Sequence, residues 1–200
     1  MRNPKNIIRL MEEVNPDFVG FIFYPGSKRY FLQQNSEIPI QVPSEKRTGV
    51  FVDSQKEEIL KMASRFQLGN VQLHGDESPQ FCKELKSEGI RIIKAIKVSN
   101  RHDILLSMDY EASCDYILFD TKDQLHGGTG KKFDWYVLHD LKLSIPYFLS
   151  GGIDPDDSEK ISNLPVRPFA IDINSRFELE PGVKSIQLIR EFKKQLNHHE

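Results

Sequence analysis

The sequence contains few cysteines and no long hydrophobic run. Cys82 and Cys114 are the only cysteines among 200 residues, which excludes a disulfide framework and a cysteine-based metal site. No apolar run approaches the roughly 18 residues that cross a bilayer, and no secretory signal is recognisable at the start. We therefore expect a cytoplasmic protein without a membrane partner.

The sequence also lacks an excess of charge of either sign. It carries 27 Lys and Arg against 29 Asp and Glu, a formal net charge of −2, and the two signs are interspersed. A nucleic-acid-binding surface would need a basic excess or cluster. With 38% hydrophobic residues, the composition is that of an ordinary globular protein. No nucleic-acid partner is expected.

Apolar segments of strand length recur along the chain and alternate with amphipathic segments. These segments are Phe18–Phe23, Thr48–Val52, Asn70–Leu73, Ile92–Ile96, Tyr116–Asp120, Tyr147–Ser150 and Phe169–Ile173. Most are continuously apolar, as in parallel strands that are covered on both faces. The alternation predicts an α/β fold with a parallel sheet. Because no Pro-, Gly- or Ser-rich linker interrupts the pattern, we expect one domain over residues 1–200.

Helix signals frame the strands. Helices are expected over Pro4–Val14 and Lys184–Leu196, Ser54 and Glu57 can form a capping box, and Ser78 is followed by a proline that suits a first helical position. A TIM (β/α)₈ barrel begins with a strand and has eight of them. Here a helix comes first and seven strands follow, so we predict such a barrel with its first strand missing from this chain.

Glycines and small polar residues follow the last two expected strands. Gly151 and Gly152 follow one of them, and Asn174 and Ser175 follow the other. In a (β/α)₈ barrel a phosphate often binds beyond the last two strands, where backbone amides form an anion cradle. A glycine pair also suits a plain turn. Two such ends side by side favour a phosphate site.

Two aspartates lie at the ends of apolar strands. Asp120 ends the segment Tyr-Ile-Leu-Phe, whose apolar neighbours can raise a carboxyl pKa and make it a general acid. A helix-capping or loop-bracing aspartate is the alternative. Asp172 is a second carboxylate in the final strand. A pair facing one cavity would suit proton transfer or the binding of sugar hydroxyls.

Other polar residues follow the earlier strands. Arg29 comes after a strand and a rigid turn and can hold a carboxylate bidentately, although a loop arginine can also be solvated surface. Gln72 can point into the barrel as a neutral substrate contact. His74 can serve the substrate as an acid or base, or orient its loop. A lysine inside the barrel needs a partner, so Lys94 or Lys97 is expected to face a ligand or a carboxylate.

Six motifs together resemble the phosphoribosylanthranilate isomerase family. They are Phe21-Ile-Phe-Tyr-Pro-x-Ser-x-Arg29-Tyr, Val71-Gln-Leu-His-Gly75, Leu118-Phe-Asp-Thr121, Gly127-Gly-Thr-Gly-Lys-x-Phe-Asp-Trp135, Leu149-Ser-Gly-Gly-Ile153 and Arg167-Pro-Phe-Ala-Ile-Asp172. The resemblance implies a TIM barrel that performs an Amadori rearrangement of a small phosphoribosyl substrate in tryptophan biosynthesis. It implies neither a metal nor an organic cofactor.

The resemblance also implies roles for individual residues. Asp120 would protonate the ribose ring oxygen, and Arg29 would hold the anthranilate carboxylate. The other implied site residues are Gln72, Asp172 and the glycine-rich loop with Gly128 around the substrate, and Gly151, Gly152 and Ser175 around the phosphate.

The chain departs from the family pattern at two places. Arg176 stands where the last phosphate loop of the family usually has glycine. The cysteine that acts as general base in the family belongs to a strand before Met1, so we expect Met1 to be an internal methionine of a longer natural protein. Cys82 and Cys114 are interpreted as packing residues.

Three readings of the function stay open at this point. The first is the anthranilate isomerase, and the second is a catalytically impaired barrel remnant that binds phosphorylated ligands or serves only as an interaction module. The third is a related barrel such as the histidine-pathway isomerase, which the pairing of Arg29 with a single Asp120 disfavours. The sequence leaves monomer and homodimer open.

Overall fold

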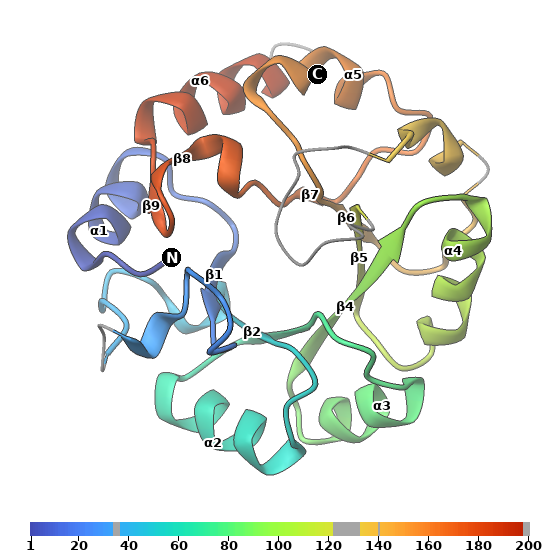
Figure 1. The fold of residues 1–200 in the computed structure, drawn as a ribbon, viewed down its shortest axis with the longest axis horizontal. Coiled ribbons are helices and arrows are strands. Elements are labelled where there is room, and N and C mark those ends of the chain that lie inside the picture. The colour runs from blue at the N-terminus through green and yellow to red at the C-terminus, as the bar shows by residue number, and fades with distance from the viewer. Residues whose placement is uncertain (34–36, 122–132, 140, 198–200) are drawn as a thin grey trace.

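Seven parallel strands form one sheet that curls into a ring, with the helices outside it (Figure 1). The structure is a computed structural model and describes residues 1–33, 37–121, 133–139 and 141–197. The strands are β1 (Val19–Ile22), β2 (Arg47–Phe51), β3 (Asn70–Leu73), β4 (Arg91–Val98), β5 (Tyr116–Thr121), β6 (Tyr147–Leu149) and β7 (Ala170–Ile171). Their spatial order equals their order in the sequence. The predicted α/β fold and all seven strands are therefore confirmed, with ends that differ by at most two residues.

The helical segments lie mostly between the strands. The α-helices are α1 (Pro4–Glu13), α2 (Lys56–Phe66), α3 (Pro79–Ser87), α4 (Arg101–Leu106), α5 (Ser158–Ser162) and α6 (Ile186–Asn197). The 3₁₀ segments are η1 (Phe31–Gln33), η2 (Ser44–Lys46), η3 (Ser107–Tyr110), η4 (Trp135–Leu138), η5 (Pro155–Asp157) and η6 (Ser175–Phe177). In the part of the chain that the structure describes, no helix is long and apolar enough to cross a membrane.

Capping by a side chain was predicted for the starts of two helices, and the structure confirms it for one of them. Ser78 accepts a hydrogen bond from the Phe81 amide at 3.2 Å, so α3 begins at the following proline. The capping box predicted at Ser54 is wrong. Helix α2 begins at Lys56, and its N-cap is Gln55, which makes no side-chain capping bond. Ser54 lies one residue too early to cap it.

A short antiparallel hairpin follows the seven-stranded sheet and was not predicted. It consists of β8 (Glu178–Glu180) and β9 (Val183–Lys184). Its second strand takes the residues with which the last helix was expected to begin, so α6 begins only at Ile186. The hairpin lies near β1 and the N-terminus (Figure 1).

Strands β1 and β7 are the two edges of the sheet and are not paired with each other over the described residues. The described residues therefore do not close the barrel by direct pairing of its first and last strands. Beside β1, the backbone nitrogen of Met1 donates a hydrogen bond to the Gly20 carbonyl. The Arg2 amide bonds the Gly182 carbonyl at 3.2 Å, which joins this segment to the hairpin.

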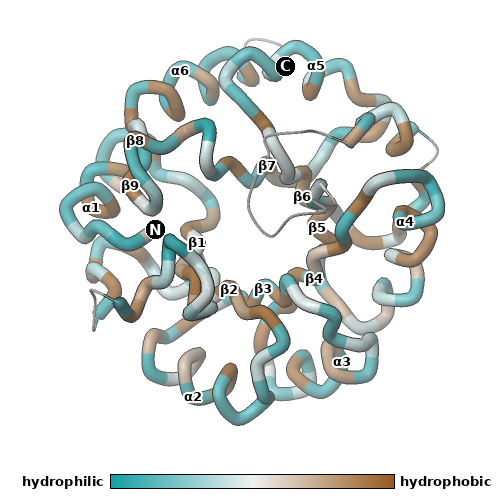
Figure 2. Tube along the Cα trace, in the orientation of Figure 1, coloured by the Kyte–Doolittle hydropathy of each residue, from teal (hydrophilic) through white to brown (hydrophobic). Residues whose placement is uncertain are grey.

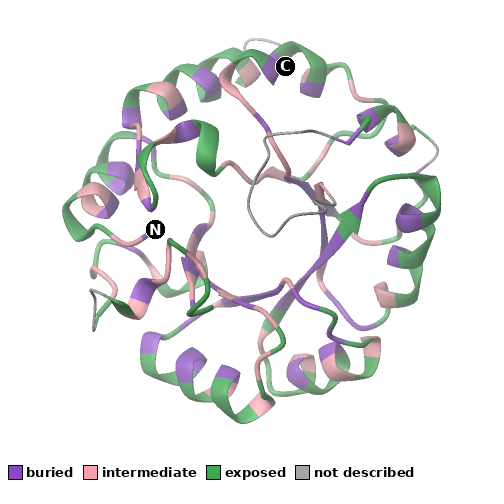
Figure 3. Ribbon diagram, in the orientation of Figure 1, coloured by how far each residue is buried: buried purple, intermediate pink, exposed green. Residues whose placement is uncertain are grey.

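The larger hydrophobic core lies between the sheet and the surrounding helices. The strands are mostly buried and the outer helix faces exposed (Figure 3), and hydrophobic residues concentrate on the strands and the inward helix faces (Figure 2). Phe21, Phe31 and Phe51 are fully buried here, and Phe23 stacks on Phe51 with ring centroids 5.2 Å apart. Burial of these rings is the main attraction between the helices and the sheet.

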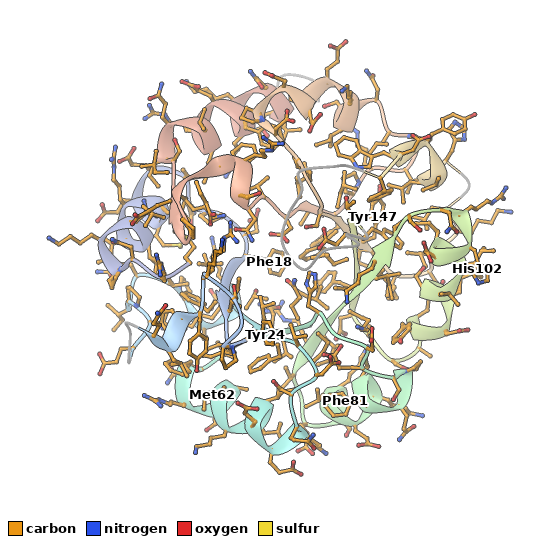
Figure 4. All side chains as sticks on the ribbon, viewed as in Figure 1. Phe18, Tyr24, Met62, Phe81, His102 and Tyr147 are labelled. Atoms are coloured by element: carbon orange, nitrogen blue, oxygen red, sulfur yellow. The ribbon has the colours of Figure 1, made fainter. Side chains whose placement is uncertain are left out.

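A smaller core fills the interior of the ring at the amino-terminal ends of the strands. Ile93, Leu118 and Phe148 are buried there together, and Phe18 packs on Phe148 with ring centroids 4.9 Å apart. Figure 4 shows Phe18 inside the ring. Apolar side chains therefore occupy this end of the interior of the ring.

A buried ion pair behind the sheet shapes the loop that follows β3. The Lys94 ammonium donates to Glu77 at 2.9 Å and to the Gly75 carbonyl at 2.7 Å, while the Gly75 amide donates to Glu77 at 3.0 Å. Lys94 is 2% exposed and lies on the helix side of β4, 5.8 Å from the Tyr110 ring. Lys94 has the expected carboxylate partner, Glu77, but the pair lies outside the ring of strands and not inside the barrel as expected.

Truncation of the inner aromatic core is expected to destabilise the fold. Phe148→Ala should lower the free energy of unfolding by about 3–5 kcal/mol, because a buried ring leaves a cavity. The control Phe169→Ala, in the same cluster but 58% exposed, should cost less than half as much. Chemical denaturation measures both, and equal losses would contradict the burial argument.

Removal of one partner of the buried ion pair is expected to destabilise the fold more than removal of both. Lys94→Met leaves the Glu77 carboxylate unpaired and should lower the free energy of unfolding by about 3–5 kcal/mol. The double variant Lys94→Met/Glu77→Gln has no buried charge and should be more stable than Lys94→Met alone. Denaturation curves of the three proteins decide this, and a less stable double variant would contradict it.

Candidate active site

The polar residues predicted at the strand ends gather at one rim of the ring. In a parallel sheet the C-terminal ends of all strands lie on the same side, so residues at or after the ends of β1, β3, β5, β6 and β7 meet at one rim. Gln72 pairs in register with Ile93, a member of the inner core, and therefore points into the ring. The same alternation carries Asp120, two residues after the inner-core residue Leu118, to the inside.

Asp120 is held on both carboxyl oxygens. Its Oδ1 accepts the backbone N–H of Thr121 at 2.8 Å, and its Oδ2 lies 3.0 Å from His74 Nε2. The side chain is one-quarter exposed, at 25%, so it is open to the mouth of the barrel. A carboxyl with a fixed orientation and access to the mouth is suited to proton transfer.

Gly151 packs directly against this aspartate. It has φ of +89°, and a Cβ at this position would lie 2.3 Å from Thr121 Oγ1 and 2.8 Å from Asp120 Oδ1. Only glycine has both the backbone freedom and the room here. The ends of β5 and β6 thus meet without an intervening side chain.

His74 extends from the end of β3 to Asp120. Its Nδ1 lies 2.9 Å from the Gln72 side-chain nitrogen, and its backbone amide donates to the Phe51 carbonyl at 2.8 Å. Gln72, His74 and Asp120 therefore form one hydrogen-bonded chain across the mouth. Lys97 pairs in register with Asp120 and is exposed at the same rim.

Asp172 is the second carboxylate at the rim. Its Oδ2 accepts the Ser150 hydroxyl at 3.0 Å, and its amide donates to the Leu149 carbonyl at 2.8 Å. Burial raises the pKa of Asp172 above its ordinary value; Lys184 opposes this shift, and the negative charge of Asp120 adds to it. The negative charge of Asp120 therefore acts on the carboxyl of Asp172, as expected for carboxylates that face one cavity.

Arg29 lies in the loop after β1 and is paired within the protein. Its Nε donates to both oxygens of Glu178, at 3.0 and 2.9 Å, and its Nη2 donates to Oε2 at 2.6 Å. Burial would raise the pKa of Glu178, but the hydrogen bond from Arg29 and the charge of Lys184 outweigh burial and lower it. Arg29 is thus fixed in position by an anionic partner.

Lys184 holds Glu178 from the other side. Its ammonium lies 3.3 Å from Glu178 Oε1 and donates to Asn174 Oδ1 at 2.9 Å and to the Ile173 carbonyl at 3.1 Å. Burial lowers the pKa of Lys184, and the charges of Glu178 and Asp172 oppose this shift. Through these contacts the β8–β9 hairpin ties Arg29 to the end of β7.

Glu178 and Lys184 were not predicted as site residues. The available signal was the Pro181-Gly182 dipeptide between two short segments, which is typical of a turn and hence of a hairpin. Nothing in the sequence connects Arg29 to Glu178, because 149 residues separate them.

The glycines and polar residues predicted for phosphate binding lie on neighbouring loops. Gly151 and Gly152 have φ of +89° and +66°, and they follow β6, which pairs with β7. Asn174 follows β7 and is held by Lys184, and Ser175 begins η6. Arg176 is exposed on that turn. Gly128, predicted for the pocket, lies outside the described residues.

Two other predictions concern metals and cysteines. The described ranges contain no group of three or more His, Cys, Asp or Glu that could hold a metal ion. Cys82 and Cys114 are fully buried in the core between the sheet and the helices, which agrees with a packing role.

Comparison with known proteins identifies the family. The family model described as N-(5'phosphoribosyl)anthranilate (PRA) isomerase matches residues 1–195. A Parabacteroides distasonis protein named N-(5'-phosphoribosyl)anthranilate isomerase is 41% identical over 203 residues, covering 99% of this chain and 91% of the relative. The protein of that name from Thermotoga maritima is 40% identical over 183 residues, covering 90% and 87% of the two chains.

Comparison with solved structures leads to the same family. The crystal structure of phosphoribosyl anthranilate isomerase from Thermotoga maritima superposes with a TM-score of 0.82 at 36% identity, covering 99% of this chain and 96% of that chain. The isomerase in complex with reduced 1-(o-carboxyphenylamino)-1-deoxyribulose 5-phosphate has a TM-score of 0.79 at 35% identity, covering 99% and 95%. With its parallel ring of strands and matching motifs, this chain belongs to the N-(5'-phosphoribosyl)anthranilate isomerase family.

Proposed function

We propose that this protein catalyses the Amadori rearrangement of N-(5'-phosphoribosyl)anthranilate to 1-(2-carboxyphenylamino)-1-deoxyribulose 5-phosphate, a step of tryptophan biosynthesis in the cytoplasm. The whole chain acts as one barrel domain in this proposal. The observation that carries it is the fixed carboxyl of Asp120 at the mouth, bonded by Thr121 and His74. Family membership supplies the substrate.

Asp120 acts as the general acid in the first step. Its proton goes to the ribose ring oxygen while the bond from this oxygen to C1' breaks, and the anthranilate nitrogen lone pair forms the C=N bond of a Schiff base. A base then removes the C2' proton, and the electron pair of that C–H bond moves to give an enamine, which tautomerises to the ketone. Positioned proton transfer of this kind contributes typically about 10²–10⁴ in rate.

The base of the second step is not assigned to a cysteine of this chain. Cys82 and Cys114 are both fully buried in the larger core, between the sheet and the helices. The Lys86 ammonium, on α3, donates to the Cys114 carbonyl at 2.9 Å, which places that cysteine on the helix side of the sheet.

The remaining residues bind the two ends of the substrate. Arg29 binds the anthranilate carboxylate, and its pairing with Glu178 supports a fixed guanidinium direction for that contact. The proposed residues for the ribose and its surroundings are Gln72, His74, Gly128 and Asp172, and those for the phosphate are Gly151, Gly152, Asn174 and Ser175. Positive-φ glycines support the phosphate assignment, because their amides can approach an anion closely.

Replacement of Asp120 tests the proposal. Asp120→Asn keeps the side-chain shape but has no acidic proton, so kcat for N-(5'-phosphoribosyl)anthranilate should fall by about 10²–10⁴ with little change in KM. The control Asp109→Asn changes an exposed carboxylate on η3 and should have wild-type turnover. An active Asp120→Asn variant, or a wild-type protein that binds the substrate without turnover, would contradict the proposal.

Replacement of Arg29 tests the binding direction. A lysine cannot donate in a planar fork to two carboxylates, so Arg29→Lys should raise KM about tenfold to hundredfold, the loss of a charge-assisted contact. Affinity for ribose 5-phosphate, which has no anthranilate carboxylate, should stay near the wild-type value. Titrations with this ligand provide the control, and an equal loss for both ligands would contradict the assignment.

A further inference from the structure

We propose that His74 is a positioning residue for Asp120 and that Gln72 keeps it as the neutral tautomer protonated on Nε2. This inference rests on the proposed role of Asp120 as general acid. It goes beyond substrate contact, because it gives Gln72 and His74 a function in selecting the state in which the acid can deliver its proton.

The hydrogen-bond chain determines which nitrogen of His74 carries the proton. An ionised carboxylate only accepts hydrogen bonds, so the 3.0 Å contact with Asp120 Oδ2 requires a proton on Nε2. The Gln72 amide nitrogen only donates, so its 2.9 Å contact requires a lone pair on Nδ1. Both conditions hold together only for the neutral imidazole.

The same contacts direct the acidic proton of Asp120. When the carboxyl is protonated, Oδ2 still accepts the N–H of His74 and Oδ1 still accepts that of Thr121. The acidic proton cannot be directed at His74, because Nε2 already carries a proton and the lone pair of Nδ1 accepts from Gln72. The proton is thereby oriented away from His74.

The His74 ring is held rigidly enough to perform this task. Its own amide is anchored to the Phe51 carbonyl, and the next residue, Gly75, is bonded through both its amide and its carbonyl by the Glu77–Lys94 pair. A Cβ at Gly75 would lie 2.2 Å from Asp53 Oδ1, so this loop is closely packed. Hydrogen bonds and packing of this kind around a functional side chain keep it in a productive geometry.

A glutamine is the appropriate partner for Nδ1, since a carboxylate there would have the opposite effect. A carboxylate at position 72 would accept a proton from Nδ1 and favour the imidazolium ion. A cation 3.0 Å from Asp120 would stabilise its carboxylate and oppose the acid form. The charges of both Asp120 and His74 act on Asp172, which would then gain a cationic neighbour in addition to Lys184.

Two variants of Gln72 separate this role from a structural one. Gln72→Glu is isosteric but should lower kcat at least about tenfold more than Gln72→Met, which has no group that can stabilise an imidazolium. Loss of packing alone predicts the reverse order, because Met changes the shape more than Glu does. Gln195→Glu, an exposed change of the same kind on α6, serves as the control. Equal kcat values, or the reverse order, would overturn the proposal.

Two variants of His74 test the neutral donor. A glutamine places an amide N–H near the position of Nε2, so His74→Gln should retain at least about tenfold more kcat than His74→Ala, with similar KM values. The control His102→Gln replaces an exposed histidine on the outer surface, visible in Figure 4, and should match the wild type. Equally inactive His74→Gln and His74→Ala variants would overturn the positioning role.

Nitrogen-15 NMR of the imidazole rings provides a measurement independent of turnover. In the wild type at neutral pH we expect His74 to be protonated on Nε2 and not on Nδ1, and in Gln72→Glu to be protonated on both. His74→Gln assigns the signal by difference. A wild-type His74 protonated on Nδ1 overturns the inference. The expected spectra with an inactive wild type would support the hydrogen-bond chain and contradict the proposed function.

Discussion

Parallel pairing of the strands is the constraint on which the site depends. Because all seven strands run in one direction around the ring, every strand that ends in a polar residue delivers it to the same rim. His74 and Asp120 come from β3 and β5, are 46 residues apart in the sequence, and lie in contact across β4. No single loop builds the site, and its precision comes from the backbone hydrogen bonds of the sheet.

The interior of the ring has two ends with different physical properties. Aromatic side chains such as Phe18 and Phe148 fill the amino-terminal end, whereas polar side chains such as His74 lie at the opposite rim. There the carboxyls of Asp120 and Asp172 share a partly buried space, where burial raises the pKa of Asp172. The packing that stabilises the barrel therefore also sets the environment of the Asp172 carboxyl.

Much of the fold could be predicted from the sequence, because a strand that is covered on both faces is continuously apolar and needs no distant information to be recognised. The candidates Asp120 and His74 were found for a related reason, since they end such strands. The predictions that failed, and the contacts that were missed, depend on how segments of the chain are placed relative to one another in space. Whether Ser54 or Gln55 caps α2 depends on where the chain leaves β2, and the ion pair of Arg29 with Glu178 joins opposite ends of the sequence.

Gly151 shows how closely the loop after β6 packs against Asp120 at the end of β5. The loop proposed to hold the phosphate has no atom between its backbone and Asp120, and even a methyl group there would overlap Thr121. A side chain at this position would have to displace Thr121 or the carboxyl of Asp120. In the proposed mechanism, residue 151 would therefore influence the position of the general acid as well as the shape of the phosphate loop.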